Sequence, residues 1–245
     1  MFPILNSQNQ TITVNLSRTD IEKGLSVPEF MTHELAEEMG IHTGDGYLSI
    51  KKSIWGTKYI YEIASSKKER DYIDNILVPL YKKIYNLNLH IRNGHSCLGC
   101  YATSKGLCEF KRSIGFPIGR KDNIQISGML FGSPYIFDFL RGLFDTDGYL
   151  RFVNRNKKAR PYPRLDITSK SKKLIYKVGE VLKVNGFTFS ITRQLQNHYL
   201  TNTPCETWRI FLYGAKNFSR WERLIGFSNP KNIQKITEWK ATGGI

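Results

Sequence analysis

The chain has no run of 18 or more apolar residues, so the sequence predicts no segment that crosses a membrane. Its first residues, MFPILNSQNQTITVNL, lack the basic start and long apolar stretch of a signal peptide. There are only four cysteines among 245 residues, which is more typical of a reduced intracellular protein than of a disulfide scaffold. We therefore expect an intracellular protein, in the cytoplasm or in an organelle or nucleoid. Cys97 and Cys100 form a CxxC, but Cys205 has no second CxxC beside it, so free thiols are favoured over zinc.

Acidic residues are also scarce relative to basic ones. The sequence has 36 Lys and Arg against 21 Asp and Glu, for a formal net charge of +15. Solubility does not require so large an excess of one sign, so the composition indicates a polyanionic partner. Nucleic acid fits this charge better than the alternatives, which are an anionic membrane surface or a basic surface without a partner.

A short segment occurs twice at an offset of 102 residues. Residues 40–48 read GIHTGDGYL, and residues 142–150 read GLFDTDGYL. Each copy ends a helical pattern with Asp-Gly and then begins a strand. Glycine inside a helix costs about 1 kcal/mol relative to alanine, so Gly40 and Gly142 predict that two helices pack closely there. Gly46 and Gly148 predict left-handed caps after the helices.

The repeated aspartates, Asp45 and Asp147, stand at helix C-termini, where a carboxylate meets unpaired carbonyls and the negative end of the dipole. A divalent cation would offset both effects. The duplicated carboxylates on a basic protein therefore suggest a two-fold symmetric metal site that faces a two-stranded polyanion.

Hydrophobic spacing predicts the same order of elements in each part of the chain: helix, two strands, helix, two strands, helix. In the first part we expect helices at 33–44, 67–86 (kinked by Pro79) and 105–113, and strands at 47–54, 58–64, 87–91 and 97–101. In the second part we expect helices at 135–148, 171–185 and 215–224, and strands at 149–154, 164–168, 188–194 and 206–213. The predicted fold class is α+β, with an N-terminal arm (1–30), a first half (31–126) and a second half (127–245).

Residues 140–148, LRGLFDTDG, resemble the signature of LAGLIDADG homing endonucleases and differ from it in three of nine letters. Residues 38–46, EMGIHTGDG, are a weaker copy that keeps the first glycine, the aspartate and the final glycine. Two copies resemble the single-chain, two-motif members of that family, and the likeness extends over roughly residues 31–240. His42 and Thr43 depart from the usual letters, and we expect His42 to be packed at the interface between the two motif helices and not to be a metal ligand.

This resemblance implies two pseudo-symmetric αββαββα halves, each with a curved antiparallel sheet that forms part of a DNA-binding saddle. The motif helices would pack at the interface between the halves. The implied activity is that of a monomeric, intron-encoded endonuclease that cuts both strands of a long DNA target with staggered ends. Its cofactor would be Mg²⁺, as two or three ions replaceable by Mn²⁺. The implied metal-binding residues are Asp45, Asp147, Gly44 and Thr146.

The resemblance also implies further residues near the scissile phosphates. Ser66 and Ser169 fall at the family's polar position, and Arg70 and Lys173 at its basic position. The central lysine is carried onto Lys121 in the first half and onto Lys231 in the second, with Lys235 as the alternative. Strand alternation predicts DNA-contacting side chains at Lys51, Ser53, Lys58, Tyr59, Tyr61, Arg92, Arg151, Arg155, Lys157, Lys158, Arg160, Arg164, Arg193, Gln194 and Arg209.

Two other functions remain open on the same fold. One is an RNA-binding intron maturase, with host intron RNA as the partner, and the other is a DNA-binding protein without catalysis. The retention of both Asp45 and Asp147 favours the enzyme.

Overall fold

A computed structural model of the chain describes residues 2–4, 12–94, 97–154, 161–197 and 202–243. These residues form two α+β halves in which helices and strands follow the predicted order. None of the helices in these ranges is both long enough and apolar enough to cross a bilayer.

The helices and strands are assigned as follows. The first half and its N-terminal arm contain β1(Phe2–Pro3), α1(Arg18–Glu22), β2(Phe30–Met31), α2(His33–Gly44), β3(Gly46–Ser53), β4(Gly56–Ser65), η1(Lys67–Glu69), α3(Arg70–Tyr72), η2(Ile73–Leu77), α4(Val78–Tyr85), β5(His90–Asn93), β6(Leu98–Thr103) and α5(Lys105–Ser113). The second half contains α6(Ile136–Asp147), β7(Gly148–Val153), β8(Tyr162–Ser169), α7(Lys172–Val184), β9(Ser190–Asn197), β10(Pro204–Tyr213), α8(Gly214–Leu224) and α9(Pro230–Ala241).

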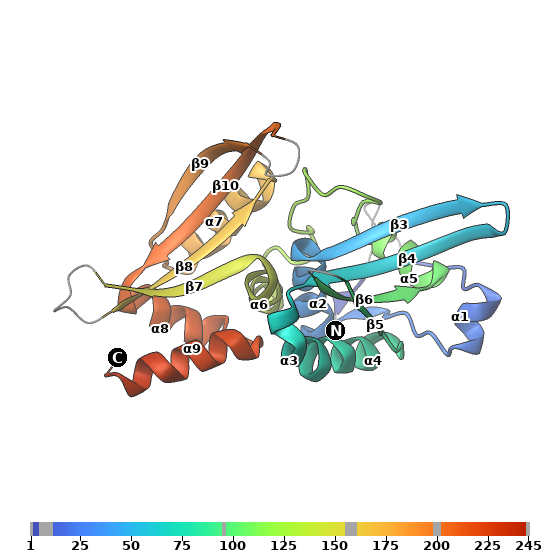
Figure 1. The fold of residues 1–245 in the computed structure, drawn as a ribbon, viewed down its shortest axis with the longest axis horizontal. Coiled ribbons are helices and arrows are strands. Elements are labelled where there is room, and N and C mark those ends of the chain that lie inside the picture. The colour runs from blue at the N-terminus through green and yellow to red at the C-terminus, as the bar shows by residue number, and fades with distance from the viewer. Residues whose placement is uncertain (1, 5–11, 95–96, 155–160, 198–201, 244–245) are drawn as a thin grey trace.

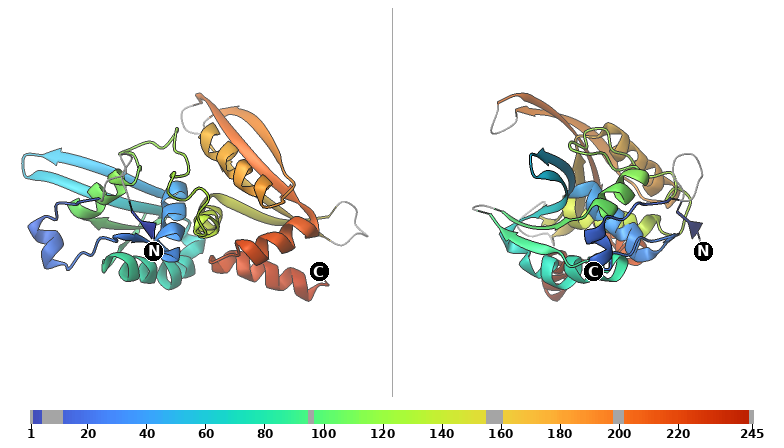
Figure 2. Two further views of the ribbon diagram at one scale, coloured as in Figure 1. Left: turned by 180° about the vertical axis from the view of Figure 1, so that it is seen from behind. Right: turned by 90° about the vertical axis from the view of Figure 1, so that its right-hand side faces the viewer.

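Each half is built on a four-stranded antiparallel sheet, and the two sheets have equivalent strand orders. The first is β3-β4-β6-β5 and the second is β7-β8-β10-β9. The sheets lie on either side of the paired helices α2 and α6, while α3, α4, α8 and α9 lie together on one side of the molecule (Figures 1 and 2). This arrangement confirms the predicted α+β class with two pseudo-symmetric halves.

Alternation along the strands gives each sheet one apolar face against the helices. In the first sheet Leu48, Tyr61 and Ile63 are buried, and in the second Leu150 and Leu212 are buried. Their neighbours in sequence point to the opposite face, which no helix covers. The uncovered faces are therefore the ones on which the predicted DNA contacts must lie.

The predicted helix over 67–86 forms in several pieces. A π-helical turn, η2, precedes α4, and Pro79 stands in the first turn of α4. Proline cannot donate a backbone hydrogen bond, and a wider turn before it accommodates that loss.

Two helices were not predicted from the sequence: the five-residue α1 in the N-terminal arm, and α9. The sequence beginning Asn229-Pro230 forms α9, with the Asn229 side chain accepting a hydrogen bond from the backbone N–H of Lys231. An Asn cap followed by proline at the first helical position is a standard helix start, so the signal was present in the sequence.

The N-terminal arm is attached to the first half by a buried carboxylate. Asp20 accepts hydrogen bonds from the Ser104 hydroxyl (2.6 Å) and from the backbone N–H of Gly106 (2.9 Å). These donors belong to the start of α5, and they lower the pKa of Asp20 in spite of its burial. The boundaries of the arm and of the two halves, at 30 and 126, remain predictions.

Candidate functional site

Helices α2 and α6 approach each other closely because glycine occupies the crossing point on both. A Cβ atom at Gly40 would overlap the carbonyl oxygen of Phe139, and one at Gly142 would overlap the carbonyl oxygen of Glu37. Each glycine therefore contacts the backbone of the opposite helix. The structure confirms that the two motif glycines serve close helix packing.

The glycines after the helices have a different role from the one predicted. Neither Gly46 nor Gly148 has a positive φ, and Gly148 is extended, with φ −85° and ψ 156°. The prediction of left-handed caps was wrong, because the chain passes directly from each helix into a strand. A Cβ at Gly46 would overlap His42, and one at Gly148 would overlap Phe144. These glycines are required for space next to the preceding helical turn.

The close helix packing brings the two motif aspartates together at adjacent helix ends. Gly44 also lies at this point, where a Cβ would stand 3.4 Å from the Asp147 carboxyl carbon. Burial, and then the negative charge of Asp147, raise the pKa of Asp45 to about 7. Burial raises the pKa of Asp147 to about 6. Among the described residues no donor hydrogen-bonds to either carboxylate, so neither negative charge is satisfied by a hydrogen bond.

Lys121 is the basic residue placed beside both aspartates. Its Nζ donates to the backbone carbonyls of His42 (2.7 Å), Thr43 (3.0 Å) and Gly44 (2.5 Å), so it caps the C-terminus of α2. Burial lowers the pKa of Lys121 to about 8, although the nearby aspartates oppose this shift. The predicted central lysine of the first half thus stands at the acidic pair.

A cavity of about 430 Å³ opens between Lys121 and Asp147. Its wall from the second half includes Ser169, which the sequence predicted, and Thr168 and Thr207, which it did not. The hydroxyl of Thr207 is buried without a hydrogen-bond partner. Thr207 lies on β10, and only the tertiary fold brings that strand beside the C-terminus of β8.

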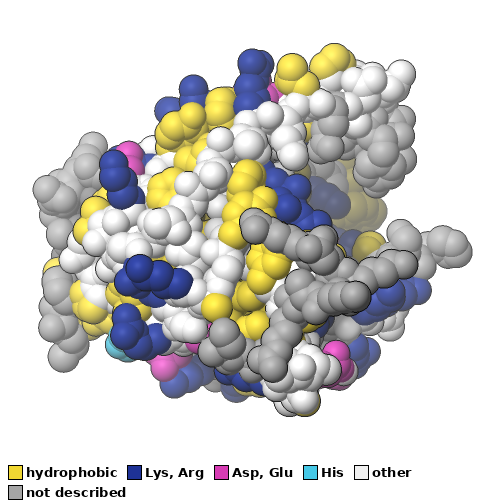
Figure 3. Space-filling model, turned by 90° about the vertical axis from the view of Figure 1, so that its left-hand side faces the viewer, with side chains coloured by type: hydrophobic (Ala, Val, Ile, Leu, Met, Phe, Trp, Pro, Cys, Tyr) yellow, Lys and Arg dark blue, Asp and Glu magenta, His cyan; other side chains and the backbone are white. Residues whose placement is uncertain are grey.

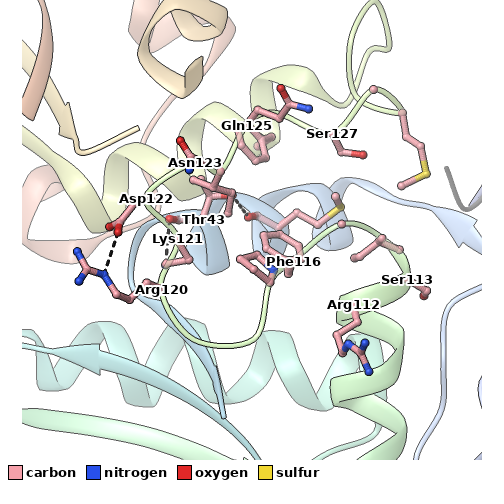
Figure 4. A pocket seen from close by; sticks show the side chains of 18 residues that line it. Thr43, Arg112, Ser113, Phe116, Arg120, Lys121, Asp122, Asn123, Gln125 and Ser127 are labelled. Atoms are coloured by element: carbon pink, nitrogen blue, oxygen red, sulfur yellow. Dashed lines mark hydrogen bonds and ion pairs between the residues drawn. The ribbon is translucent and has the colours of Figure 1, made fainter. Parts of the chain in front are cut away.

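A second cavity, of about 730 Å³, adjoins the same lysine on the side of the 112–129 segment. Lys121 points to the carbonyl of Thr43 there, while Arg120 is paired with Asp122 at 2.8 Å (Figure 4). The cavity is also lined by Phe116 and by polar side chains of the same segment. The basic end of this space is continuous with the residues around the acidic pair.

On the Asp45 side of the pair, a glutamate that the sequence analysis missed holds the predicted lysine of the second half. Glu69 pairs with Lys231 at 3.3 Å, and the two belong to opposite halves. The negative charge of Glu69 also contributes to the raised pKa of Asp45. Lys235, the alternative to Lys231, donates instead to the backbone carbonyl of Leu150 at 3.1 Å. The helix α9 is therefore the element that brings both lysines to this region.

A buried aspartate inside the second motif anchors the loop before α9. Asp145 accepts hydrogen bonds from the backbone N–H groups of Ser228 (2.5 Å) and Asn229 (3.0 Å) and from the Asn232 side chain (3.0 Å). Burial raises its pKa to about 7 in spite of these donors. Asp145 thus positions the segment that carries Lys231.

Among the predicted site residues, the cavity at Asp147 is not lined by Ser66, Arg70, Lys173 or Thr146. Ser66 caps the short helix η1 by accepting from the N–H of Lys68, and Arg70 pairs with Asp74 on the same helical run. Lys173 is exposed near the start of α7. The Thr146 hydroxyl donates to backbone carbonyls of its own helix. The carbonyl oxygen of Gly44, the other predicted metal ligand, accepts a hydrogen bond from Lys121. Their assignment to catalysis or metal binding stays a prediction.

His42 is fully buried in the first half, where its ring stacks on Phe116 with centroids 3.8 Å apart. Burial, followed by the charges of Lys111 and Lys121, holds its pKa well below the usual range. One turn earlier on α2, Glu38 forms a fully buried ion pair with Lys111 and accepts from three tyrosine hydroxyls. The side chain of His42 is packed as expected, although it lies within one half and not between the two.

The strand register decides which predicted DNA contacts face away from the helices. In the first sheet Lys51 pairs with Lys58 on the uncovered face. Tyr61 was wrongly assigned to this face, because it is fully buried on the helix side with its hydroxyl near Glu38. Tyr59 shares that side and packs partly buried against the core. Ser53 and Arg92 lie with Lys51 on the uncovered face.

In the second sheet the register places Arg151, Arg164, Arg209 and Gln194 on the uncovered face. Arg193 alternates to the other face, where it pairs with Glu206 at 3.0 Å, so its predicted position was wrong. Arg155, Lys157, Lys158 and Arg160 lie outside the described residues. Seen from the end formed by the second half, Lys and Arg side chains are more widespread than Asp and Glu (Figure 3).

The comparisons with known proteins agree with this geometry. Residues 134–226 match the family model described as a LAGLIDADG-like domain. The structure of the homing endonuclease I-DmoI in complex with DNA and Ca aligns with a TM-score of 0.58 at 17% identity, covering 84% of this chain and 97% of that one. The LAGLIDADG homing endonuclease I-GzeII in complex with its DNA target aligns with a TM-score of 0.54 at 10% identity, covering 88% and 89%.

A curated relative from Methanocaldococcus jannaschii is named glutamine–fructose-6-phosphate aminotransferase (isomerizing). It is 23% identical over 216 residues, which cover 85% of this chain but 18% of that protein. The chain therefore spans less than a fifth of the length of this relative.

Proposed function

We propose that the chain, of which residues 134–226 match the LAGLIDADG-like domain and whose fold is that of LAGLIDADG homing endonucleases, is a site-specific endonuclease that cuts double-stranded DNA. The observation that carries this proposal is the placement of Asp45 and Asp147 at adjacent helix ends, beside Lys121 and between two uncovered basic sheet faces. We further propose that the protein acts as a monomer inside the cell, on a target associated with an intron.

The two carboxylates fit a divalent cation. They are only partly exposed, the charge of Asp147 disfavours ionisation of Asp45, and no described residue donates a hydrogen bond to them. Mg²⁺ is commonly held by one or two carboxylates together with water and substrate phosphates, so a third protein carboxylate is not required. When bound there, such a cation supplies Lewis-acid stabilisation of the charge that develops on the phosphate. The related I-DmoI has been crystallised with Ca and with Mn.

Side chains of the protein would bind and orient the phosphate and the attacking water. Lys121 holds the end of α2 and places a positive charge next to Asp147, where a scissile phosphate would meet it. Ser169 and Thr207 line the cavity with hydroxyls that can orient water or phosphate oxygens. On the other side, Lys231 is held near Asp45 by Glu69. The site therefore offers one lysine for each of the two strands.

The test uses purified protein, a library of duplex DNA sites and Mg²⁺. We expect cleavage of a selected site by the wild type, none by Asp45→Asn or Asp147→Asn, and Mg²⁺-independent DNA binding by all three. Asp74→Asn, which alters an exposed helical carboxylate, is the matched control and should cut normally. Full cutting by either motif variant would reject the site. Binding without cutting by the wild type would favour a non-catalytic DNA-binding protein, and tight binding of intron RNA alone would favour a maturase.

A further inference from the structure

The uncovered face of the second sheet contains one buried acid. Asp166 lies on β8, opposite Tyr149 on one neighbouring strand and Phe211 on the other. Leu165 and Ile167 on either side of it point to the helices, so Asp166 points to the uncovered face. It is nevertheless only 1% exposed, because larger side chains cover it.

Those side chains are three arginines from three adjacent strands. The Nε of Arg164 donates to one oxygen of Asp166 at 2.8 Å. The Nη2 of Arg209 donates to the other oxygen at 2.5 Å, and the Nη2 of Arg151 lies 3.4 Å from the same oxygen. One carboxylate thus faces three guanidinium groups, which leaves a net positive charge of two at a single point of the face.

Aromatic rings contact two of these arginines from the side. Arg151 lies over the ring of Tyr149 at 5.6 Å, and Arg164 lies over the rings of Phe211 (5.0 Å) and Tyr213 (4.9 Å). Each guanidinium has five N–H donors in a rigid plane. Asp166 engages only part of them, and the side chains of Arg151, Arg164 and Arg209 remain 36%, 18% and 23% exposed. The arginines are therefore oriented but retain donors for a ligand.

The first sheet has a smaller version of this arrangement. Glu62 lies opposite Tyr47, as Asp166 lies opposite Tyr149, but it pairs with a single arginine, Arg92. Arg92 lies over the ring of Tyr101 at 4.9 Å. The two halves thus differ in how many oriented arginines each sheet presents.

We propose that Asp166 is a positioning residue that presents Arg151, Arg164 and Arg209 to a guanine-rich segment of the DNA major groove. This inference rests on the proposed function. A guanidinium held in a fixed plane matches the O6 and N7 acceptors of guanine, which is the commonest specific contact of arginine with a base. The guanidinium group also matches phosphate oxygens, but a shared carboxylate weakens the attraction to phosphate. The three arginines lie on the uncovered face of the sheet, where alternation predicts the contacts with base edges, so we assign them to base recognition.

The experiment uses the duplex selected from the library of sites. Guanine N7 methylation interference should locate two or more guanines in one half-site, and replacement of each by 7-deazaguanine should weaken wild-type binding about tenfold. Asp166→Asn should reduce this discrimination to less than about threefold. Its binding to unrelated duplex DNA should not weaken, because the variant has lost a negative charge.

Glu62→Gln is the matched control, because it removes the equivalent carboxylate from the other sheet. It should leave the discrimination at these guanines unchanged. If Asp166→Asn fails to fold, Arg209→Lys is the alternative variant. It keeps the positive charge but removes the planar guanidinium group, so it should lose the discrimination between guanine and 7-deazaguanine at one position. A change in thermal stability alone would not alter the ratio of the binding affinities for the guanine duplex and the 7-deazaguanine duplex.

Two results would overturn the inference while leaving the proposed function intact. One is a selected site without guanines under the second sheet, and the other is unchanged discrimination in Asp166→Asn. Absence of any DNA binding by the wild type would overturn the proposed function and this inference together.

Discussion

The carboxylate pair predicts how the stability of the metal-free protein depends on pH. The pKa of Asp45 is raised from 3.8 to about 7, so folding favours its protonated form. Below about pH 4 the carboxyl is neutral in both folded and unfolded chains and costs nothing. Between about pH 4 and pH 7 the unfolded chain releases this proton while the folded protein still holds it, and above about pH 7 the folded protein carries the ionised carboxylate at full cost. The free energy of unfolding therefore falls between pH 4 and pH 8.

Asp45→Asn removes this penalty. A shift of about three pKa units at about 1.36 kcal/mol each sets a ceiling of about 4 kcal/mol on the gain. Because Asp45 is not completely shielded from solvent, we expect about half of that, or about 2 kcal/mol at pH 8. For a protein of this size, 1 kcal/mol corresponds to about 2–4 °C, so the melting temperature should rise by about 6 °C.

The assay is thermal unfolding in a chelating buffer at pH 4.5 and pH 8. The increase in melting temperature of Asp45→Asn over the wild type should be small at pH 4.5 and should reach its full value at pH 8. Asp74→Asn should show no such gain. Added Mg²⁺ should then stabilise the wild type at pH 8 and leave Asp45→Asn nearly unchanged, because a ligand stabilises only the protein that binds it. If Asp45→Asn is no more stable than the wild type at pH 8 in the chelating buffer, burial and the neighbouring Asp147 do not raise the pKa of Asp45 as described.

Three further predictions concern packing, burial and charge. Gly142→Ala should destabilise the protein by about 3 kcal/mol in denaturant unfolding, because the new methyl group overlaps the backbone at Glu37; an unchanged unfolding midpoint would refute the close packing. Lys111→Met should cost about 3–5 kcal/mol in the same measurement by leaving the buried Glu38 carboxylate unpaired, and restoration by Glu38→Gln in the double variant would support this cause. Binding to duplex DNA should weaken about a thousandfold between 50 and 200 mM salt if six or more phosphates are contacted, whereas a flat response would contradict a saddle on DNA.

Local patterns in the sequence were sufficient for most of the helices and strands and for the pairing of Asp45 with Asp147. Helical spacing, alternation and the repeated Asp-Gly identified two equivalent halves, and glycine at positions 40 and 142 predicted the helix crossing. These signals act over a few residues, or through a repeat, so they can be recognised in a linear sequence. The role of Gly46 and Gly148 was mistaken because a short glycine-containing turn and a direct passage into a strand look the same in sequence.

Only the tertiary structure decided the contacts between distant strands and helices. A shift of one residue in strand register moves a side chain to the opposite face, and this is why Tyr61 and Arg193 were misplaced. The same register gathers three arginines on Asp166, although no motif joins them in the sequence. The pairing of Glu69 with Lys231 depends on how α9 docks between the halves. Long-range pairings of this kind are set by packing geometry, which no local pattern encodes.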